Sequence, residues 1–135
     1  MVPWDVGGAG CDSNVDAVRS WVASGADINV VDERGDTPLM LASYWHRAEC
    51  VAEMLRLGAD ARRVTDTYGV TALHLLAARG SDDGGGADVV RLLVAAGCDA
   101  AVRDDDGRTA VEFARDARCV EWGREVEGWV AAAIA

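Results

Sequence analysis

One short pattern recurs three times along the chain and constrains its fold more than any other feature. It reads D-x-x-G-x-T-[PA]-[LV], and its three copies occupy residues 32–39, 66–73 and 104–111. The glycines of the copies, Gly35, Gly69 and Gly107, are 34 and 38 residues apart. A second signature, G-[AC]-D, begins at Gly25, Gly58 and Gly97, ahead of each copy. Two interlocked signatures at a period of this length are typical of a chain built from stacked structural repeats.

The residues within one unit predict a turn, a helix, a second turn and a second helix. Thr37 is a favoured helix N-cap, and Pro38 suits the first helical position, where no amide donor is required. A turn near His46 separates this helix from the next, in which apolar residues from Cys50 onward recur at helical spacing. Gly58 is expected to end the second helix as a C′ glycine. Each unit leaves one helical face apolar, so it requires a neighbouring unit.

This pattern resembles the ankyrin repeat, in which a T-P-L-H segment opens the first helix and G-A-D follows the second. The resemblance runs from about Val15 to Val130, and the segment at 71–74 departs from T-P-L-H at one position. It implies an all-α solenoid in a single domain, residues 1–135. Within it we expect an N-terminal capping unit at 1–30 and a repeat at 31–64. A second repeat at 65–102 carries a loop insertion at 81–86, and a C-terminal capping repeat occupies 103–135.

The motif histidine is present in one copy only. Met40 and Glu112 stand at its position in the first and third copies, whereas His74 occupies it in the second. The resemblance implies that His74 hydrogen-bonds to backbone in the neighbouring turn and holds the repeats in register.

Composition narrows the classes of partner. The 135 residues include 13 basic residues, all arginine, and 23 acidic residues, for a net charge of −10. This balance argues against nucleic acid and against anionic membrane surfaces as the main partner, because both require a concentrated basic face. We find neither a secretory signal nor a long apolar run. The expectation is a cytoplasmic protein, with the nucleus as an alternative, whose four cysteines are reduced.

Three sequence features that could bind a ligand are better explained structurally. Gly84–Gly86 lacks the lysine of a phosphate-binding loop and reads as a flexible turn. The acidic run 104–106 lacks the terminal glutamate of a calcium loop and reads as a hairpin tip. His46 and Cys50 have a spacing that could share a metal, yet they straddle a turn. We therefore expect no metal, no cofactor and no enzymatic activity.

The resemblance also implies where a partner binds. In the ankyrin repeat, the outward positions are the residues around the glycine of each D-x-x-G motif, which forms a projecting turn or finger. The residues near the end of each first helix also face outward. On this chain the outward positions are Glu33, Arg34, Asp36, Tyr44, Trp45, Thr67, Tyr68, Val70, Arg79, Asp105, Asp106 and Arg108. Tyr, Trp and Arg dominate interface energetics, so the aromatic residues in this set favour a binding stripe. As an alternative, Trp45 covers apolar surface of the N-terminal cap, and Tyr44 is an ordinary surface tyrosine.

These features predict a protein–protein interaction module, an adaptor, scaffold or inhibitor, that binds a partner protein of unidentified class through its concave face and finger tips. The alternative is a self-associating or assembly subunit that docks through its C-terminal helix. That helix ends in the apolar segment 129–135, whereas terminal repeats normally present a polar outer face. We expect a monomer, with weak self-association through this helix as the alternative.

Overall fold

The computed structural model describes residues 15–31, 35–66, 68–78, 85–117 and 120–134. The described residues form seven helices and no strand. The helices are α2 (Val15–Ala23), α3 (Pro38–Tyr44), α4 (Ala48–Arg56), α5 (Ala72–Ala78), α6 (Gly86–Ala95), α7 (Ala110–Ala117) and α8 (Val120–Ile134). The predicted all-α class is therefore confirmed.

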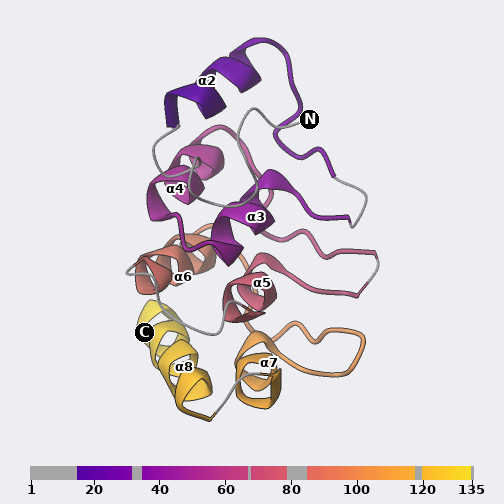
Figure 1. Cartoon of the computed structure of the whole chain (residues 1–135), viewed down its shortest axis with the longest axis vertical. Helices are drawn as coiled ribbons and strands as arrows, with labels where there is room; N and C mark the ends of the chain where they lie inside the picture. Colours follow the sequence, from indigo (N-terminus) through magenta and orange to yellow (C-terminus); the bar gives the residue numbers. More distant parts are fainter. Residues whose placement is uncertain (1–14, 32–34, 67, 79–84, 118–119, 135) are drawn as a thin grey trace.

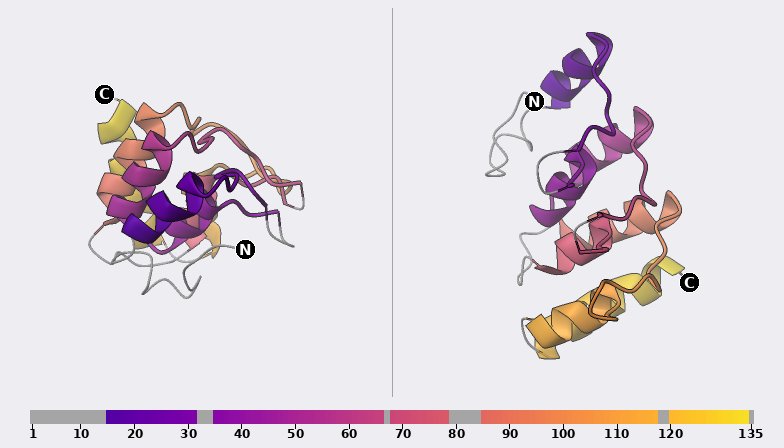
Figure 2. Two further views of the ribbon diagram at one scale, coloured as in Figure 1. Left: turned by 90° about the horizontal axis from the view of Figure 1, so that it is seen from above. Right: turned by 90° about the vertical axis from the view of Figure 1, so that its right-hand side faces the viewer.

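The helices stack in two layers (Figures 1 and 2). The outer layer holds α2, α4, α6 and α8, and the inner layer holds α3, α5 and α7, with consecutive members of each layer in contact. The pairs α3–α4, α5–α6 and α7–α8 are the helical hairpins of successive units. Extended connections, which we call fingers, project to one side of the inner layer (Figure 1).

Local sequence signals start and end the helices as predicted. Thr37 is the N-cap of α3, and its hydroxyl accepts a hydrogen bond from the Met40 amide at 3.3 Å. Gly58 follows the C-cap of α4 with φ +100°, and the equivalent Gly25 and Gly97 have φ +99° and +101°. In each G-[AC]-D signature the aspartate accepts a hydrogen bond from the amide two residues later, as Asp60 does from Arg62 at 2.9 Å. The G-[AC]-D signature thus supplies both the glycine that ends the helix and the aspartate that stabilises the turn after it.

The core runs continuously through the stack. Its largest fully buried side chains include Leu73, Leu76 and Leu93 in the central units. Valines of α2, α4, α6 and α8 extend the same cluster to both ends. Leu93 is completely buried within this core.

The predicted insertion loop 81–86 ends earlier than expected. Gly86 is the buried first residue of α6, and Gly85 is its N-cap, so neither belongs to a flexible turn. A Cβ at Gly85 would lie 2.2 Å from the backbone oxygen of His46, which itself has φ +57°. Gly85 therefore permits close contact between two hairpin turns. The remainder of the predicted loop, residues 81–84, lies outside the described residues, as does the first part of the N-terminal cap.

Two tryptophans of α8, Trp122 and Trp129, pack against His46. The Trp122 indole donates to the Ala77 oxygen at 2.7 Å, and its ring lies 5.4 Å from that of Trp129. The His46 ring is 6.0 Å from Trp122, and its Nε2 is 3.2 Å from the Leu76 oxygen. His46 thus serves packing between units.

Most of α8 presents a polar outer face, in contrast to the apolar segment that ends it. Trp122, Val126 and Val130 are buried, whereas the outward positions include Glu121, Arg124, Glu125 and Glu127. Among the side chains of α8 whose burial is described, apolar ones are exposed only in the last turn, with Ile134 at 64%. The buried side chains of α8 therefore face the stack, whereas Ile134 faces solvent. Within the described ranges, no helix is both long and apolar enough to cross a bilayer.

Candidate protein-binding face

The second and third fingers are closed by hydrogen bonds. In the second, residues 65–70, the Thr65 amide donates to the Val70 oxygen at 2.9 Å, and the Val70 amide donates to the Thr65 hydroxyl at 3.1 Å. In the third, residues 104–108, the Asp104 amide donates to the Arg108 oxygen at 2.8 Å. These bonds fix the outline of each finger.

A backbone contact joins the two fingers. The Asp105 amide donates to the Tyr68 oxygen at 2.9 Å. Gly69, with φ +67°, lies against Asp105, and a Cβ there would be 2.7 Å from the carboxylate. This contact holds Tyr68 and Asp105 side by side.

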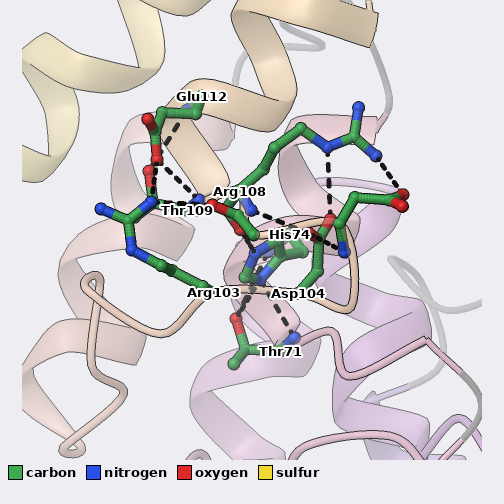
Figure 3. Close-up of polar contacts among 9 residues, drawn as sticks. Thr71, His74, Arg103, Asp104, Arg108, Thr109 and Glu112 are labelled. Carbon is green, nitrogen blue, oxygen red and sulfur yellow. Dashed lines mark hydrogen bonds and ion pairs between the residues drawn. The ribbon is translucent and has the colours of Figure 1, made fainter.

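His74 connects the second repeat to the third finger (Figure 3). Its Nε2 lies 2.8 Å from the Arg108 oxygen, and its Nδ1 lies 3.2 Å from the Thr71 amide nitrogen. A carbonyl only accepts and an amide only donates, so the proton of neutral His74 is on Nε2. Burial lowers the pKa of His74 below its ordinary value of 6.5. The register role implied for His74 is confirmed by this geometry.

Glu112 replaces that histidine in the third copy and caps its own helix instead (Figure 3). The Thr109 amide donates to the Glu112 carboxylate at 3.0 Å, and the Glu112 amide lies 3.3 Å from the Thr109 hydroxyl. This reciprocal pair is a capping box. The hydrogen bond from the Thr109 backbone is the main reason that the pKa of Glu112 is lowered.

Arg108, predicted as a partner-binding residue, is occupied within the third finger. Its guanidinium is 3.5 Å from Asp104 and 3.1 Å from Asp106, and it lies over the Phe113 ring at 4.8 Å. Asp104 is buried and also accepts from the Asp106 and Arg108 amides. Arg108 therefore holds the acidic tip of the third finger, residues 104–106, in place.

Apart from Val70, the other predicted binding residues fall into three groups. Tyr68 is 66% exposed, and Asp105 and Asp106 are exposed beside it. Tyr44 and Trp45 are half-buried at the end of α3, where their rings meet edge to face at 5.0 Å, and Asp36 is also half-buried. Four positions, Glu33, Arg34, Thr67 and Arg79, lie outside the described residues.

Among the predicted positions that the structure describes, Val70 is the one that is buried rather than outward. Its side chain is only 8% exposed, because the Thr65–Val70 bonds turn it from the finger surface into the interior. What remains on the described part of the finger surface is Tyr68 with the acidic tip.

A groove that was not predicted from the sequence lies between the outer helices α2 and α4, away from the fingers. It has a volume of about 580 Å³, and Glu53 on its wall has a side chain only 8% exposed. Arg56 and Arg19 both donate to this carboxylate, the Arg19 bond spanning 3.1 Å. These hydrogen bonds, that of Arg56 first, lower the pKa of Glu53 to about 2. The i, i+3 spacing signals the Glu53–Arg56 pair, but Arg19 is 34 residues distant and reaches it only through the fold.

The described residues hold no group of three or more His, Cys, Asp or Glu side chains arranged to hold a metal ion. Cys50 and Cys98 are buried and unbridged, and burial raises the pKa of the Cys98 thiol.

Comparison with known proteins agrees with the repeat architecture. Residues 8–104 match the family model described as "Ankyrin repeats (3 copies)". The chain is 34% identical over 117 residues to a protein of Oryza sativa subsp. japonica named probable E3 ubiquitin-protein ligase XBOS34, covering 85% of this chain and 22% of that protein. It is 36% identical over 107 residues to the putative E3 ubiquitin-protein ligase XBAT34 of Arabidopsis thaliana, covering 78% and 27%. Ankyrin repeat and SOCS box protein 3 of Bos taurus is 33% identical over 96 residues, covering 70% and 17%. The chain thus spans less than a third of the length of each of these relatives.

Proposed function

Because the chain belongs to the ankyrin-repeat family, we propose that it is an adaptor or inhibitor that covers the surface of one partner protein. Ankyrin repeats are generic protein-binding modules. The finer assignment concerns the surface used, which we take to be the second and third fingers with the adjoining inner helices.

The observation that carries this proposal is the exposed ring of Tyr68 beside an acidic tip. A tyrosine offers apolar area and a hydroxyl at low entropic cost, and tyrosine is enriched among residues that dominate binding energy. The Asp105–Tyr68 hydrogen bond fixes the backbone that carries this ring. Little backbone entropy is then lost at Tyr68 when a partner binds.

We propose binding without catalysis. Both histidines of the chain contact backbone oxygens, His46 that of Leu76 and His74 that of Arg108, so each has a structural use. Two relatives are named as ubiquitin ligases, but the chain corresponds to 22% and 27% of their lengths. Their named activity is not carried over to this chain.

Self-association through α8 is the second candidate. It rests on the exposed Ile134 in the last turn of that helix. The charged outward side chains of the preceding turns make this surface smaller than the sequence suggested, so we favour the finger surface.

Two substitutions of similar exposure separate these candidates. Tyr68→Ala removes an exposed ring from the second finger, and Ile134→Ala removes an exposed side chain from α8. Both side chains project into solvent, so both variants should keep the circular dichroism and melting temperature of the wild type. Each is immobilised and exposed to lysate of source cells, and the retained proteins are quantified by mass spectrometry.

The finger proposal requires a protein that wild type and Ile134→Ala retain and Tyr68→Ala loses. A protein lost only with Ile134→Ala, or a wild-type dimer that this substitution dissociates, would transfer the function to α8. Retention of the same proteins by all three would reject the finger surface.

A further inference from the structure

Equivalent positions in the outer helices α2 and α6 carry a carboxylate and an arginine. In α4 the carboxylate is present, but the arginine is replaced by alanine. Each of α2, α4 and α6 is followed by the glycine of a G-[AC]-D signature, which aligns the three helices. Nine residues before that glycine stands a carboxylate in every case. Six residues before it stands an arginine in α2 and α6 and an alanine in α4. In chain order these pairs are Asp16 and Arg19, Glu49 and Ala52, and Asp88 and Arg91.

The two complete pairs are ion pairs within one helical turn. Arg19 reaches Asp16 at 2.8 Å, and Arg91 likewise pairs with Asp88. Glu49 has Ala52 in place of that arginine, and within the described part of the chain it forms no ion pair. Glu49 is therefore the one carboxylate of the three whose partner cation is missing.

Glu49 and Ala52 both line the groove described above. Its wall is formed by Val15, Asp16, Arg19, Glu49, Ala52, Glu53 and Arg56. Arg19 and Arg56 are already engaged with Glu53 and so do not replace the absent cation. With three carboxylates and two guanidiniums on the wall, the lining residues carry one excess negative charge, which one monovalent cation would balance.

The segment preceding α2 cannot supply that cation as a side chain. Residues 1–14 contain no lysine, arginine or histidine. A chain of net charge −10 also favours the approach of basic segments from other proteins. The cation is therefore expected from a partner.

We propose that the α2–α4 groove binds one arginine side chain from a basic segment of a partner protein. The guanidinium lies over Ala52 and pairs with Glu49, in the place that Arg19 and Arg91 take beside their own carboxylates. Arginine is the fitting occupant because its planar guanidinium can pair with a carboxylate through two parallel hydrogen bonds. The groove is on the outer layer, whereas the fingers project from the inner layer, so this site is independent of the finger surface (Figure 1).

The test is a titration of the full chain, labelled with ¹⁵N, with Nα-acetyl-arginine amide. Nα-acetyl-citrulline amide, which has nearly the same shape without the charge, is the matched control probe. We expect weak but saturable shifts of the Glu49, Ala52 and Arg56 amide signals with the arginine probe only. The shifts should weaken as the salt concentration rises, because the groove is open to solvent.

Two variants decide whether the missing arginine is the cause. Ala52→Arg supplies the guanidinium from within α4 and should abolish the saturable shifts. Ala87→Arg adds the same charge at an exposed position of α6 and should leave them unchanged. Alanine and arginine have similar helix propensities, so both variants should fold.

Equal shifts with the citrulline probe, no saturable shift in the groove, or undiminished binding by Ala52→Arg would each overturn the proposal. A wild-type dimer that Ala52→Arg dissociates would overturn it too, because the arginine would then come from a second copy. None of these results depends on Tyr68, so failure here is distinguishable from failure of the finger proposal.

Discussion

The Nε2 atom of His74 lies 2.8 Å from the backbone oxygen of Arg108, 34 residues further along the chain. This hydrogen bond joins the start of one inner helix to the finger of the next unit. Its strength depends on neutral His74, because a protonated Nδ1 would face the Thr71 amide donor. The contact therefore couples the register of the repeats to pH.

We predict that the contribution of His74 to stability diminishes below about pH 6.5. The folded-state pKa is lowered from 6.5 by burial, so the unfolded chain takes up the proton first as the pH falls. At pH 8, His74→Phe should cost about 1–3 kcal/mol, because the Arg108 oxygen loses its donor. Urea unfolding of both proteins between pH 8 and pH 5 measures the difference, which should shrink toward acid. A constant difference across this range would contradict the prediction.

Glu53 should stabilise the fold above pH 4.5 and cease to do so as the pH falls toward 2. Hydrogen bonds from Arg56 and Arg19 lower its pKa from 4.5 to about 2, so its folded state resists protonation while the unfolded chain accepts it. Comparison of wild type with Glu53→Gln by urea unfolding isolates this group from the other carboxylates. The advantage of the wild type should be constant above pH 5 and decline between 4.5 and 2. If wild type is still more stable than Glu53→Gln near pH 2, the substitution removes more than a charge, and the prediction is contradicted.

Gly85, the N-cap of α6, and Gly128, inside α8, should respond oppositely to replacement by alanine. Gly85→Ala would place a Cβ 2.2 Å from the His46 oxygen, so the turn must shift, at a cost of about 1–3 kcal/mol. Gly128 has nothing within 4 Å of its added Cβ and lies inside α8, so Gly128→Ala should gain about 0.5–1 kcal/mol. Thermal unfolding of both variants provides the comparison. A neutral Gly85→Ala would mean that the two hairpin turns are not in close contact.

Leu93→Ala should cost about 2–5 kcal/mol, since it removes a fully buried side chain from the centre of the stack. This cost is a large fraction of the free energy of unfolding of a typical folded domain, which is about 5–15 kcal/mol. Val64→Ala, at an exposed position, should stay within about 0.5 kcal/mol of wild type. Urea midpoints of the two variants test the contrast, and similar midpoints would place Leu93 outside the cooperative core.

Features that depend on near neighbours in sequence could be predicted well. The Thr37 cap, the turn after Gly58 and the helices between them involve residues a few positions apart, and all three are confirmed. The register bond of His74 could be anticipated only through the resemblance, since its acceptor belongs to another unit.

The candidate site was less predictable, because exposure is a property of packing. Val70 follows a finger glycine just as an outward residue would, yet two bonds to Thr65 turn it inward. Arg108 was expected to face a partner, but Asp104 and Asp106 engage its guanidinium. Tyr68 remained exposed, and no signal in its own segment distinguished it from Val70.

The amino-acid sequence by itself determined the repeating unit and the number of times it occurs, because caps and glycine turns act over a few bonds of the backbone. The tertiary structure decided which side chains reach solvent and which charges meet. Arg19 and Glu53 form one ion pair across 34 residues, and His46 meets Gly85 across 39. Such contacts arise only when the units stack, since stacking sets the distance between side chains that the backbone leaves far apart.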